Sequence, residues 1–297
     1  MEVRFLRPEL ERLHARTQEA FAMMSTEIGL EVFGYALDYA TSGSDMFSEE
    51  GLYLDALLPY LAEHVPTPAS ILDVGGGTGR AAIPLARAGY DVTMLEPAAS
   101  GLRLAHEKAQ AAGVAERLSY VCGYAVDAAV LGERAFDAVL GLQSLVYEKD
   151  LRSTLAVLLR VSRKVLCFDA YSRYGFLAGR MPGGYAYAAG YTPATMLHVL
   201  TEHRTPGEKT LDTPDPLPLY TSDEIAQIAR QAGLQVDKVV PVSYREVFEW
   251  QNGSDQTTVA ELDRLMREDR VLKELAACHL VLGRKMDQSR QSGAAAR

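Results

Sequence analysis

The fold class of this chain is decided by the stretch Ile71-Leu72-Asp73-Val74-Gly75-Gly76-Gly77-Thr78-Gly79. A short apolar segment, 70–74, has the length and composition of a buried strand, and a helix is expected directly after the glycines. Glycine allows a positive φ and a close approach of the backbone to a ligand. In open α/β sheets, the turn that follows the first strand is where nucleotides bind.

The spacing of the glycines separates the classes of nucleotide site. A dinucleotide fingerprint needs G-x-G-x-x-G, which, counted from Gly75 and Gly77, puts its third glycine at position 80, where the chain has Arg80. The sequence has D-x-G-x-G-x-G from Asp73 to Gly79, and it has no G-x-x-x-x-G-K-[ST] phosphate loop. An acid before such a turn suits a ligand that carries an ammonium group and no pyrophosphate.

Around this turn, apolar strand-like segments alternate with helical ones from residue 69 onward. Repeated strand–helix units predict a parallel sheet with helices on both faces. The expected strands are 70–74, 91–95, 118–122, 136–141, 165–169, 234–242 and 279–283, and the expected helices between them are 80–88, 99–112, 151–162 and 222–232, with Ser222 as a plausible N-cap.

The remaining segments are expected to be additions to this core. Residues 1–68 are predicted to form an N-terminal helical cap, and 286–297 a disordered tail. Residues 171–220 contain six of the 15 tyrosines and six of the 13 prolines, which favours a substrate-binding lid, although a plain surface insertion is the alternative. A helical insertion is expected over 243–276.

Charge limits the choice of partner. Of the 297 residues, 30 are Lys or Arg and 39 are Asp or Glu, so the net charge is −9. A protein that binds a nucleic-acid backbone or an anionic membrane normally has a basic surface, so neither is expected as a partner. Residues 17–79 contain ten acids and no Lys or Arg. This stretch is either a solvated acidic face or a negative rim around a site for cationic ligands.

The cysteines and the hydropathy exclude several other classes of protein. Cys122, Cys167 and Cys278 form no CxxC pair and no disulfide framework, and no cluster of His and Cys has metal-site spacing. No run of about 20 apolar residues is present, and the N-terminus does not resemble a signal peptide. A soluble cytoplasmic protein without a metal, acting as a monomer or homodimer, is therefore expected.

At this point the chain resembles the class I S-adenosylmethionine-dependent methyltransferases over residues 69–285. Residues 73–79 match the glycine-rich first motif of that family, and Glu96 with Pro97 ends the second strand, where the family has an acid. Residues 123–125 follow the third strand, and FDAVLGLQSLVY, 136–147, resembles the fourth-strand motif. The segments LYTSDEIAQIARQAGLQV and HLVLGRK are similar to the late helix and the final strand.

The resemblance implies a Rossmann-like sheet of seven strands, mostly parallel with an antiparallel last strand, with helices on both faces, an N-terminal helical cap and a lid after strand 5. It implies S-adenosyl-L-methionine as the cofactor. Glu96 would bind the two ribose hydroxyls, and Asp73 would orient the ammonium end or else bond to the glycine turn. The cofactor contacts implied are Tyr39, Asp73, Gly75, Gly76, Gly77, Thr78, Gly79, Glu96, Pro97, Gly123, Tyr124, Ala125, Leu140, Gly141 and Gln143.

Two positions depart from the family. Where it often has Asp after the third strand, this chain has Tyr124, which could stack beside adenine or simply pack, while Asp127 could substitute for the missing acid. Residues 161–164, Val-Ser-Arg-Lys, replace the common Lys-Pro-Gly-Gly.

The reaction implied is transfer of a methyl group to a small-molecule acceptor, a specialised metabolite or an amino-acid derivative, by direct displacement. Alignment supplies much of the rate, and a base is needed only if the nucleophile must lose a proton. The candidates for catalysis are His198, His203, Asp169 and Tyr147. Each histidine could equally be a surface or packing residue, and Asp169 could bind substrate or equally cap the turn that follows it.

Three alternatives stay open at this stage. An enzyme of the same fold could use S-adenosylmethionine without transferring its methyl group. A non-enzymatic protein could bind the cofactor only, and a nicotinamide oxidoreductase is the rival at the level of the fold.

Overall fold

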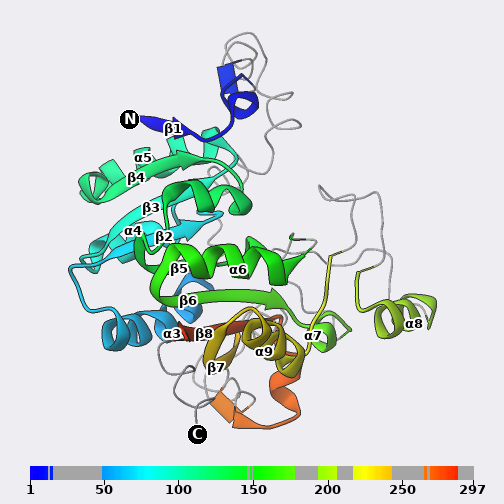
Figure 1. Cartoon of the computed structure of the whole chain (residues 1–297). Helices are drawn as coiled ribbons and strands as arrows, with labels where there is room; N and C mark the ends of the chain where they lie inside the picture. The colour runs from blue at the N-terminus through cyan, green and yellow to red at the C-terminus, as the bar shows by residue number, and fades with distance from the viewer. Residues whose placement is uncertain are drawn as a thin grey trace, which may run out of the picture.

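The structure is a computed structural model, and it describes residues 1–12, 14–15, 49–145, 148, 150–177, 193–205, 217–242, 264–265 and 268–286. These residues build one eight-stranded sheet with the order β1-β4-β3-β2-β5-β6-β8-β7 (Figure 1). In chain order the strands are β1 Val3–Phe5, β2 Ser70–Val74, β3 Asp91–Glu96, β4 Leu118–Cys122, β5 Phe136–Gly141, β6 Ser162–Tyr171, β7 Leu234–Val242 and β8 Cys278–Lys285.

Strand directions confirm the predicted fold class. Strands β1 to β6 run parallel to one another, and β8 lies antiparallel between β6 and β7. The chain order reverses direction across the sheet at β2, because β3 and β4 extend to one side of it and β5 and β6 to the other. This switch point is where open α/β sheets bind their ligands.

The prediction of seven strands is wrong by one. Val3–Phe5 forms an additional parallel edge strand on β4, with Val3 beside Tyr120 and Phe5 beside Cys122. Val3 and Phe5 are half-buried and Arg4 is exposed, which is the alternation of an edge strand. Three residues are too short a run for a period of two to be recognised in sequence.

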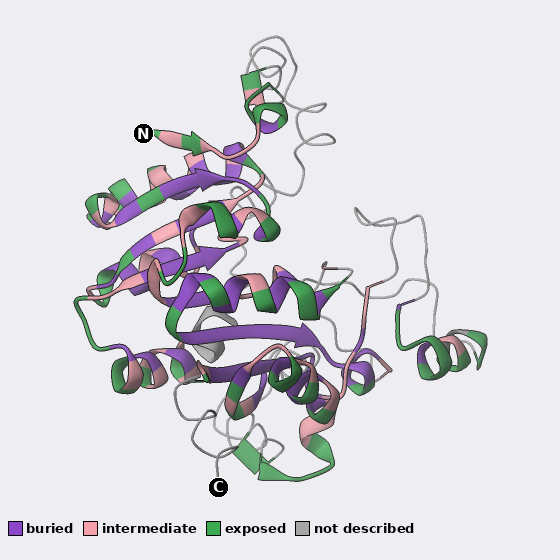
Figure 2. Ribbon diagram, in the orientation of Figure 1, coloured by how far each residue is buried: buried purple, intermediate pink, exposed green. Residues whose placement is uncertain are grey.

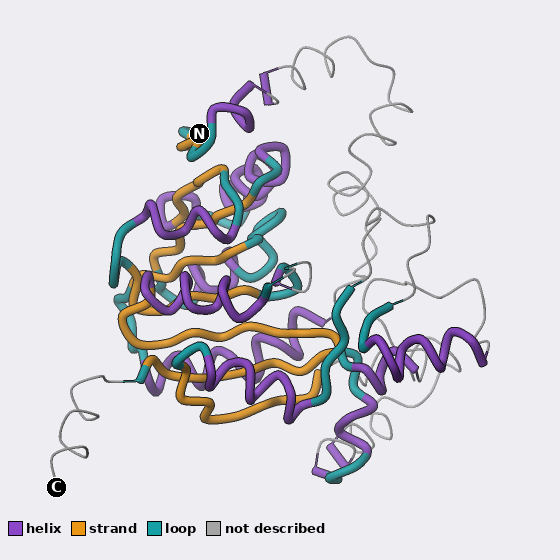
Figure 3. Tube along the Cα trace, turned by 45° about the vertical axis from the view of Figure 1, so that its right-hand side comes forward, coloured by secondary structure: helices purple, strands orange, loops and turns teal. Residues whose placement is uncertain are grey.

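Helices cover both faces of the sheet, as Figure 3 shows. On one face lie α3 Glu49–His64, α4 Ala82–Arg87 and α5 Ala99–Ala111, and on the other α6 Leu151–Val161, α9 Ser222–Gln231 and the 3₁₀ helix η2 Ala125–Leu131. The predicted N-cap of α9 is wrong by one residue, because the Thr221 hydroxyl accepts from Glu224 N at 3.2 Å, and the Glu224 carboxylate accepts from Thr221 N at 2.9 Å. This is a capping box.

The core has two layers, one on each face of the sheet, and the central strands between them are mostly buried (Figure 2). Because side chains alternate along a strand, Ile71 packs in the layer under α3, α4 and α5, and Leu72 packs in the layer under α6 and α9. Asp73 lies two positions after Ile71 on β2, and Glu96 lies two positions after Met94 on β3. Each acid therefore faces the same side of the sheet as that apolar residue, the side covered by α4 and α5.

Two further short helices, α7 Arg173–Leu177 and α8 Pro193–Glu202, lie beyond the carboxyl end of β6 (Figure 1). The predicted helical insertion 243–276 falls mostly outside the described residues. Its end is not one continuous helix, because a 3₁₀ helix, η5 Leu272–Leu275, begins after a turn in which Asp269 accepts from Val271 N and Leu272 N. Within the described part of the chain, every helix is too short or too polar to span a membrane.

Candidate functional site

The glycine turn is built by hydrogen bonds at the carboxyl end of β2. Gly75 N donates to Leu95 O at 2.7 Å, and Gly79 N donates to Gly76 O at 2.9 Å. Gly75, Gly77 and Gly79 have φ values of +70°, +52° and +84°, the region that glycine adopts without strain. A Cβ atom on Gly75 would lie 2.2 Å from Ser144 Cβ, so no larger residue fits there.

Three strand ends are joined around this turn. The Ser144 hydroxyl donates to Val74 O at 2.6 Å, which ties the segment after β5 to the end of β2. Gln143, with a left-handed φ of +53°, donates its backbone N–H to Asp169 Oδ1 on β6 at 2.6 Å. Asp169 is fully buried, and its carboxylate holds the segment after β5 rather than the turn that follows Asp169 itself.

Glu96 faces the same turn from the end of β3. Its Oε2 accepts from Gly77 N at 3.0 Å, and its Oε1 accepts from Ala98 N at 3.0 Å. Burial raises the pKa of Glu96, while the two backbone hydrogen bonds partly oppose that rise. A carboxylate has about four lone-pair positions, so each oxygen can still accept one further hydrogen bond from a ligand.

Asp73 is the most unusual acid of the site. Its side chain is 2% exposed, and Oδ2 has no hydrogen-bond partner among the residues that the structure describes. Burial raises the pKa of Asp73 to about 7, the negative charge of Glu96 adds to the rise, and Arg80 opposes it. A Cβ on Gly76 would lie 3.1 Å from Oδ2, so this oxygen points at the backbone of the glycine turn.

At the end of β4, Tyr124 and Asp127 have different environments. Tyr124 is 44% exposed, while Asp127 accepts from Arg7 Nε at 2.7 Å, from Arg7 Nη2 at 2.8 Å and from Tyr124 N at 2.9 Å. The Arg7 guanidinium also lies 5.1 Å from the centre of the Tyr124 ring. Asp127 is therefore largely occupied within the protein, which weakens the interpretation that it replaces a missing adenine-binding acid.

Arg7 was not found by the sequence analysis. Its partner is 120 positions away, and no motif marks the pair. Only the pairing of β1 with β4 brings the two together.

The other predicted cofactor contacts line the same edge of the sheet in different ways. Thr78 is buried and its hydroxyl accepts from Lys108 Nζ at 3.1 Å, and Pro97 O accepts from Cys122 Sγ at 3.3 Å. The Leu140 side chain is fully buried in the core layer, so only its backbone can face the site. Tyr39 and Tyr147 lie outside the described residues.

The two histidines lie apart from the glycine turn, at α8. His203 follows the last residue of α8 with a left-handed φ of +55°, and its Nδ1 lies 4.0 Å from Glu224 Oε1. His198 Nε2 is buried without a hydrogen-bond partner among the described residues. Figure 1 shows α8 beyond α7, on the side of the sheet where β6 ends.

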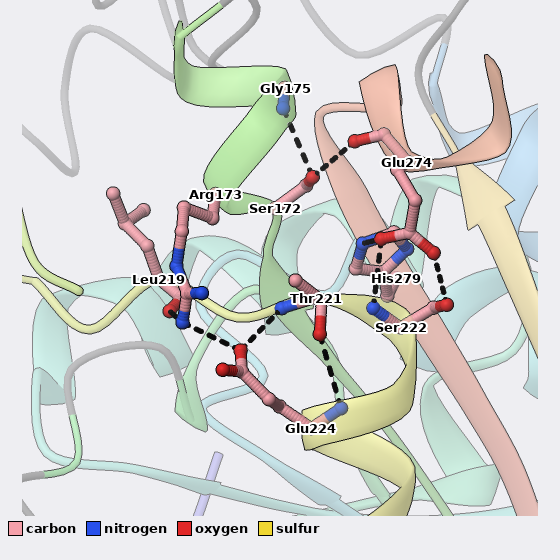
Figure 4. A network of polar contacts seen from close by, with 9 residues as sticks. All are labelled: Ser172, Arg173, Gly175, Leu219, Thr221, Ser222, Glu224, Glu274 and His279. Atoms are coloured by element: carbon pink, nitrogen blue, oxygen red, sulfur yellow. Dashed lines mark hydrogen bonds and ion pairs between the residues drawn. The ribbon is translucent and has the colours of Figure 1, made fainter. Parts of the chain in front are cut away.

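A polar network fixes the base of the predicted lid and was also missed by the sequence analysis (Figure 4). Arg173 Nη2 donates to Glu224 Oε2 at 2.6 Å and to Leu219 O at 3.3 Å. The Ser222 hydroxyl and backbone N–H both donate to Glu274, whose Oε2 lies 3.4 Å from His279 Nε2. We call these residues the α7–α9 network; its members are Ser172, Arg173, Thr221, Ser222, Glu224, Glu274 and His279.

The carboxylate of Glu274 is strongly stabilised in this network. Burial by itself raises its pKa, but the nearby His279 imidazole and the two hydrogen bonds from Ser222 outweigh that effect and bring the pKa to about 2. Since Glu274, Ser222 and His279 come from η5, α9 and β8, their contacts join three elements at the carboxyl edge of the sheet.

The segment that contains the glycine turn is similar in sequence to known proteins. Residues 71–164 match the family model of the methyltransferase domain. The tRNA 5-carboxymethoxyuridine methyltransferase of Escherichia coli is 33% identical over 126 residues, which are 42% of this chain and 48% of that protein. The ubiquinone biosynthesis O-methyltransferase of Azorhizobium caulinodans is 41% identical over 80 residues, 27% of this chain and 30% of that protein. The chain thus matches about half or less of the length of these relatives.

Solved structures share the fold. An S-adenosylmethionine-dependent methyltransferase from Methanosarcina mazei matches with a TM-score of 0.53 at 14% identity, over 77% of this chain and 97% of that one. The magnesium protoporphyrin IX methyltransferase of Synechocystis, solved with SAH, matches with a TM-score of 0.50 at 13% identity, over 83% of this chain and 95% of that one.

Proposed function

We propose, from the premise that residues 71–164 form a class I methyltransferase domain, that this chain is an S-adenosylmethionine-dependent methyltransferase acting on a small molecule. The observation that carries the proposal is the pair of acids at the glycine turn, of which Asp73 is buried and Glu96 is half-buried. Glu96 accepts a hydrogen bond from Gly77 N, and Asp73 directs toward Gly76 a carboxylate oxygen that has no hydrogen-bond partner among the described residues. A cationic nucleoside with vicinal hydroxyls matches both acids.

The residues present fit this cofactor. A Cβ on Gly77 would meet only Gly75 O, at 4.0 Å, so the missing side chain there leaves room for a ligand above the turn, and Asp73 Oδ2 supplies a buried acceptor for an ammonium group. Glu96 keeps two acceptor positions for the ribose hydroxyls, and residues 123–125 would border the adenine. Pro97, Leu140, Gly141 and Gln143 would complete the pocket, together with Tyr39 from the predicted cap.

Bound S-adenosylmethionine supplies an electrophilic methyl group on a positively charged sulfur. The role of the protein is to hold the cofactor and the acceptor in line. Orientation alone can lower the barrier to methyl transfer by several kcal/mol, about 7–11 in well-aligned model reactions. Asp169, bonded to Gln143 N, keeps the segment after β5 in place for this purpose. His198, His203 and Tyr147 remain candidates for accepting a proton from the acceptor.

A small-molecule acceptor is favoured by charge. The net charge of −9 gives no electrostatic attraction to a polyphosphate chain, although one relative acts on tRNA. Residues 1–68 as a cap that also supplies the edge strand β1, 171–220 as a lid, 243–276 as a helical insertion and 286–297 as a tail complete the proposed organisation. A cytoplasmic monomer or homodimer is part of the same proposal.

Two measurements test this function. Calorimetry with S-adenosylhomocysteine and with NAD should show binding of the first only, and NAD binding alone would overturn the proposal. A screen with methyl-labelled cofactor against a metabolite library, with bulk tRNA as a separate arm, identifies the acceptor. Label on tRNA only would contradict the small-molecule acceptor, and turnover of an acceptor without label would favour the alternative enzyme that keeps the methyl group on the cofactor.

A further inference from the structure

The N-terminal edge strand places Arg7 at the carboxyl end of β4. Because β1 and β4 are parallel, the residues that follow β1 lie beside the residues that follow β4. Leu6 N donates to Cys122 O at 2.9 Å, and a Cβ on Gly123 would lie 3.0 Å from Leu6 Cδ1. Residues 6–7 are therefore packed against the turn 123–125.

Arg7 makes two different contacts at this turn. Its Nε and Nη2 donate to the two oxygens of Asp127 at 2.7 and 2.8 Å, the rigid two-pronged arrangement that only arginine forms. Its guanidinium also lies 5.1 Å from the centre of the Tyr124 ring, within cation–π range. Asp127 in turn accepts from Tyr124 N at 2.9 Å, so Arg7, Tyr124 and Asp127 form a closed triangle.

The exposed fractions of the three side chains show which of them a ligand can still contact. The side chain of Asp127 is 13% exposed and that of Arg7 is 36% exposed, while Tyr124 is 44% exposed. The carboxylate of Asp127 is therefore used in contacts within the protein, while the ring of Tyr124 stays exposed. A planar base can stack on such a ring without any hydrogen bond from an acid.

We propose that Arg7 is a positioning residue for the adenine end of the cofactor pocket, acting through Tyr124 and Asp127. The inference rests on the proposed function, since it assigns the purine to residues 123–125. Arg7 holds the ring of Tyr124 and the turn that precedes η2 in one geometry. Without it, the Asp127 carboxylate keeps, among the described residues, only its hydrogen bond from Tyr124 N, and the ring loses its cationic neighbour.

The test compares Arg7→Met with Arg117→Met. Arg117 donates to Asp91 at 2.9 Å at the opposite end of β3 and β4, so its loss breaks a surface Arg–Asp pair on the same two strands, away from the turn. Calorimetry measures the affinity for S-adenosylhomocysteine and for 5′-methylthioadenosine, which keeps the adenine and ribose but lacks the amino-acid end. Thermal unfolding without ligand reports stability separately.

We expect Arg7→Met to weaken both ligands by a similar factor of about tenfold, while Arg117→Met stays within about twofold of the wild type. Tyr124→Leu should weaken both ligands as well, and adding it to Arg7→Met should cost less than the product of the two single effects. Asp73→Asn is the opposite control, because it should weaken S-adenosylhomocysteine and leave 5′-methylthioadenosine nearly unchanged.

Unchanged affinity in Arg7→Met, or equal losses in Arg7→Met and Arg117→Met, would overturn the inference. So would a loss for S-adenosylhomocysteine without a loss for 5′-methylthioadenosine, since Arg7 would then act at the other end of the ligand. A wild-type protein that binds neither ligand would refute the proposed function itself and this inference with it. The two failures are thus distinguished by the wild-type measurement.

Discussion

Glu96 Oε2 accepts a hydrogen bond from Gly77 N at 3.0 Å, so the acid that ends β3 is fixed to the glycine turn that ends β2. The carboxylate therefore has its place before any ligand arrives. Preorganisation of this kind reduces the ordering cost of binding.

The first prediction concerns Glu96→Ala. Loss of a charge-assisted contact to two hydroxyls should cost about 1.5–3 kcal/mol of binding, or roughly 10- to 150-fold in the affinity for S-adenosylhomocysteine by calorimetry. Asp91→Asn, at the exposed start of the same strand, should leave the affinity unchanged. An affinity of Glu96→Ala within about threefold of the wild type would refute the ribose assignment.

The second prediction concerns Asp73→Asn and pH. Burial raises the pKa of Asp73 to about 7 from 3.8, so the folded protein binds this proton more tightly than the unfolded chain. The ionised carboxylate thus lowers stability progressively as pH rises from about 4 to 7. Asp73→Asn should be more stable than the wild type at pH 8, on the order of 2 kcal/mol in urea unfolding, with no gain at pH 4. The exposed Asp55→Asn removes the same charge and should show no such trend.

The third prediction follows from the same carboxyl group. An ammonium group beside Asp73 favours the ionised form, so binding of S-adenosylhomocysteine near pH 6.5 should release a proton. Calorimetry in buffers of different ionisation enthalpy measures that proton. The release should disappear in Asp73→Asn, and equal binding enthalpies in all buffers for the wild type would contradict a contact between Asp73 and the ligand.

The fourth prediction concerns Gly75→Ala. A methyl group there would meet Ser144 Cβ at 2.2 Å and would also hold a residue other than glycine at a φ of +70°. The substitution should lower the free energy of unfolding by about 3 kcal/mol or more. Gly113→Ala is a matched control with the same φ of +70° and nothing within 4 Å, so it isolates the backbone cost, about 1 kcal/mol. Similar losses at the two positions would show that Ser144 makes room.

The fifth prediction concerns Glu274→Gln in the α7–α9 network. Its pKa is lowered to about 2 from 4.5, so the ionised carboxylate contributes stability above pH 4.5 that is lost as pH falls toward 2. Glu274→Gln should be less stable than the wild type at pH 7, on the order of 2 kcal/mol, and the difference should shrink between pH 4.5 and 3. Glu107→Gln, on the exposed face of α5, should be neutral at every pH. A constant difference from pH 7 to pH 3 would contradict the role of the ionised form.

The sheet could be predicted because its signals are local. Each of the parallel strands β2 to β6 contains an apolar run bounded by turns, and the spacing of Asp73, Gly75, Gly77 and Gly79 is visible within seven residues. The acid of Glu96 is found in the same way, because it ends the next strand. Strand ends meet at one edge of a parallel sheet, so these residues converge without further information.

The remaining contacts could not be predicted because they join distant segments through ordinary residue types. Arg7 and Asp127 are 120 positions apart, and Ser222 and Glu274 are 52 apart. Arg and Asp are frequent at surfaces, and nothing in their neighbours marks one pair among many. The three residues of β1 have the same difficulty, since their pairing is defined only by β4.

The position of β8 between β6 and β7 has a consequence for synthesis on the ribosome. Strands β2 to β6 can pair with one another as they emerge, but among the strands that the structure describes β7 pairs only with β8, and β8 ends at Lys285. Until that residue has left the exit tunnel, the open edges of β6 and β7 are exposed for association with other nascent chains. The edges of β6 and β7 are therefore covered late in synthesis, and chaperones are expected to bind the nascent chain mainly at these strands.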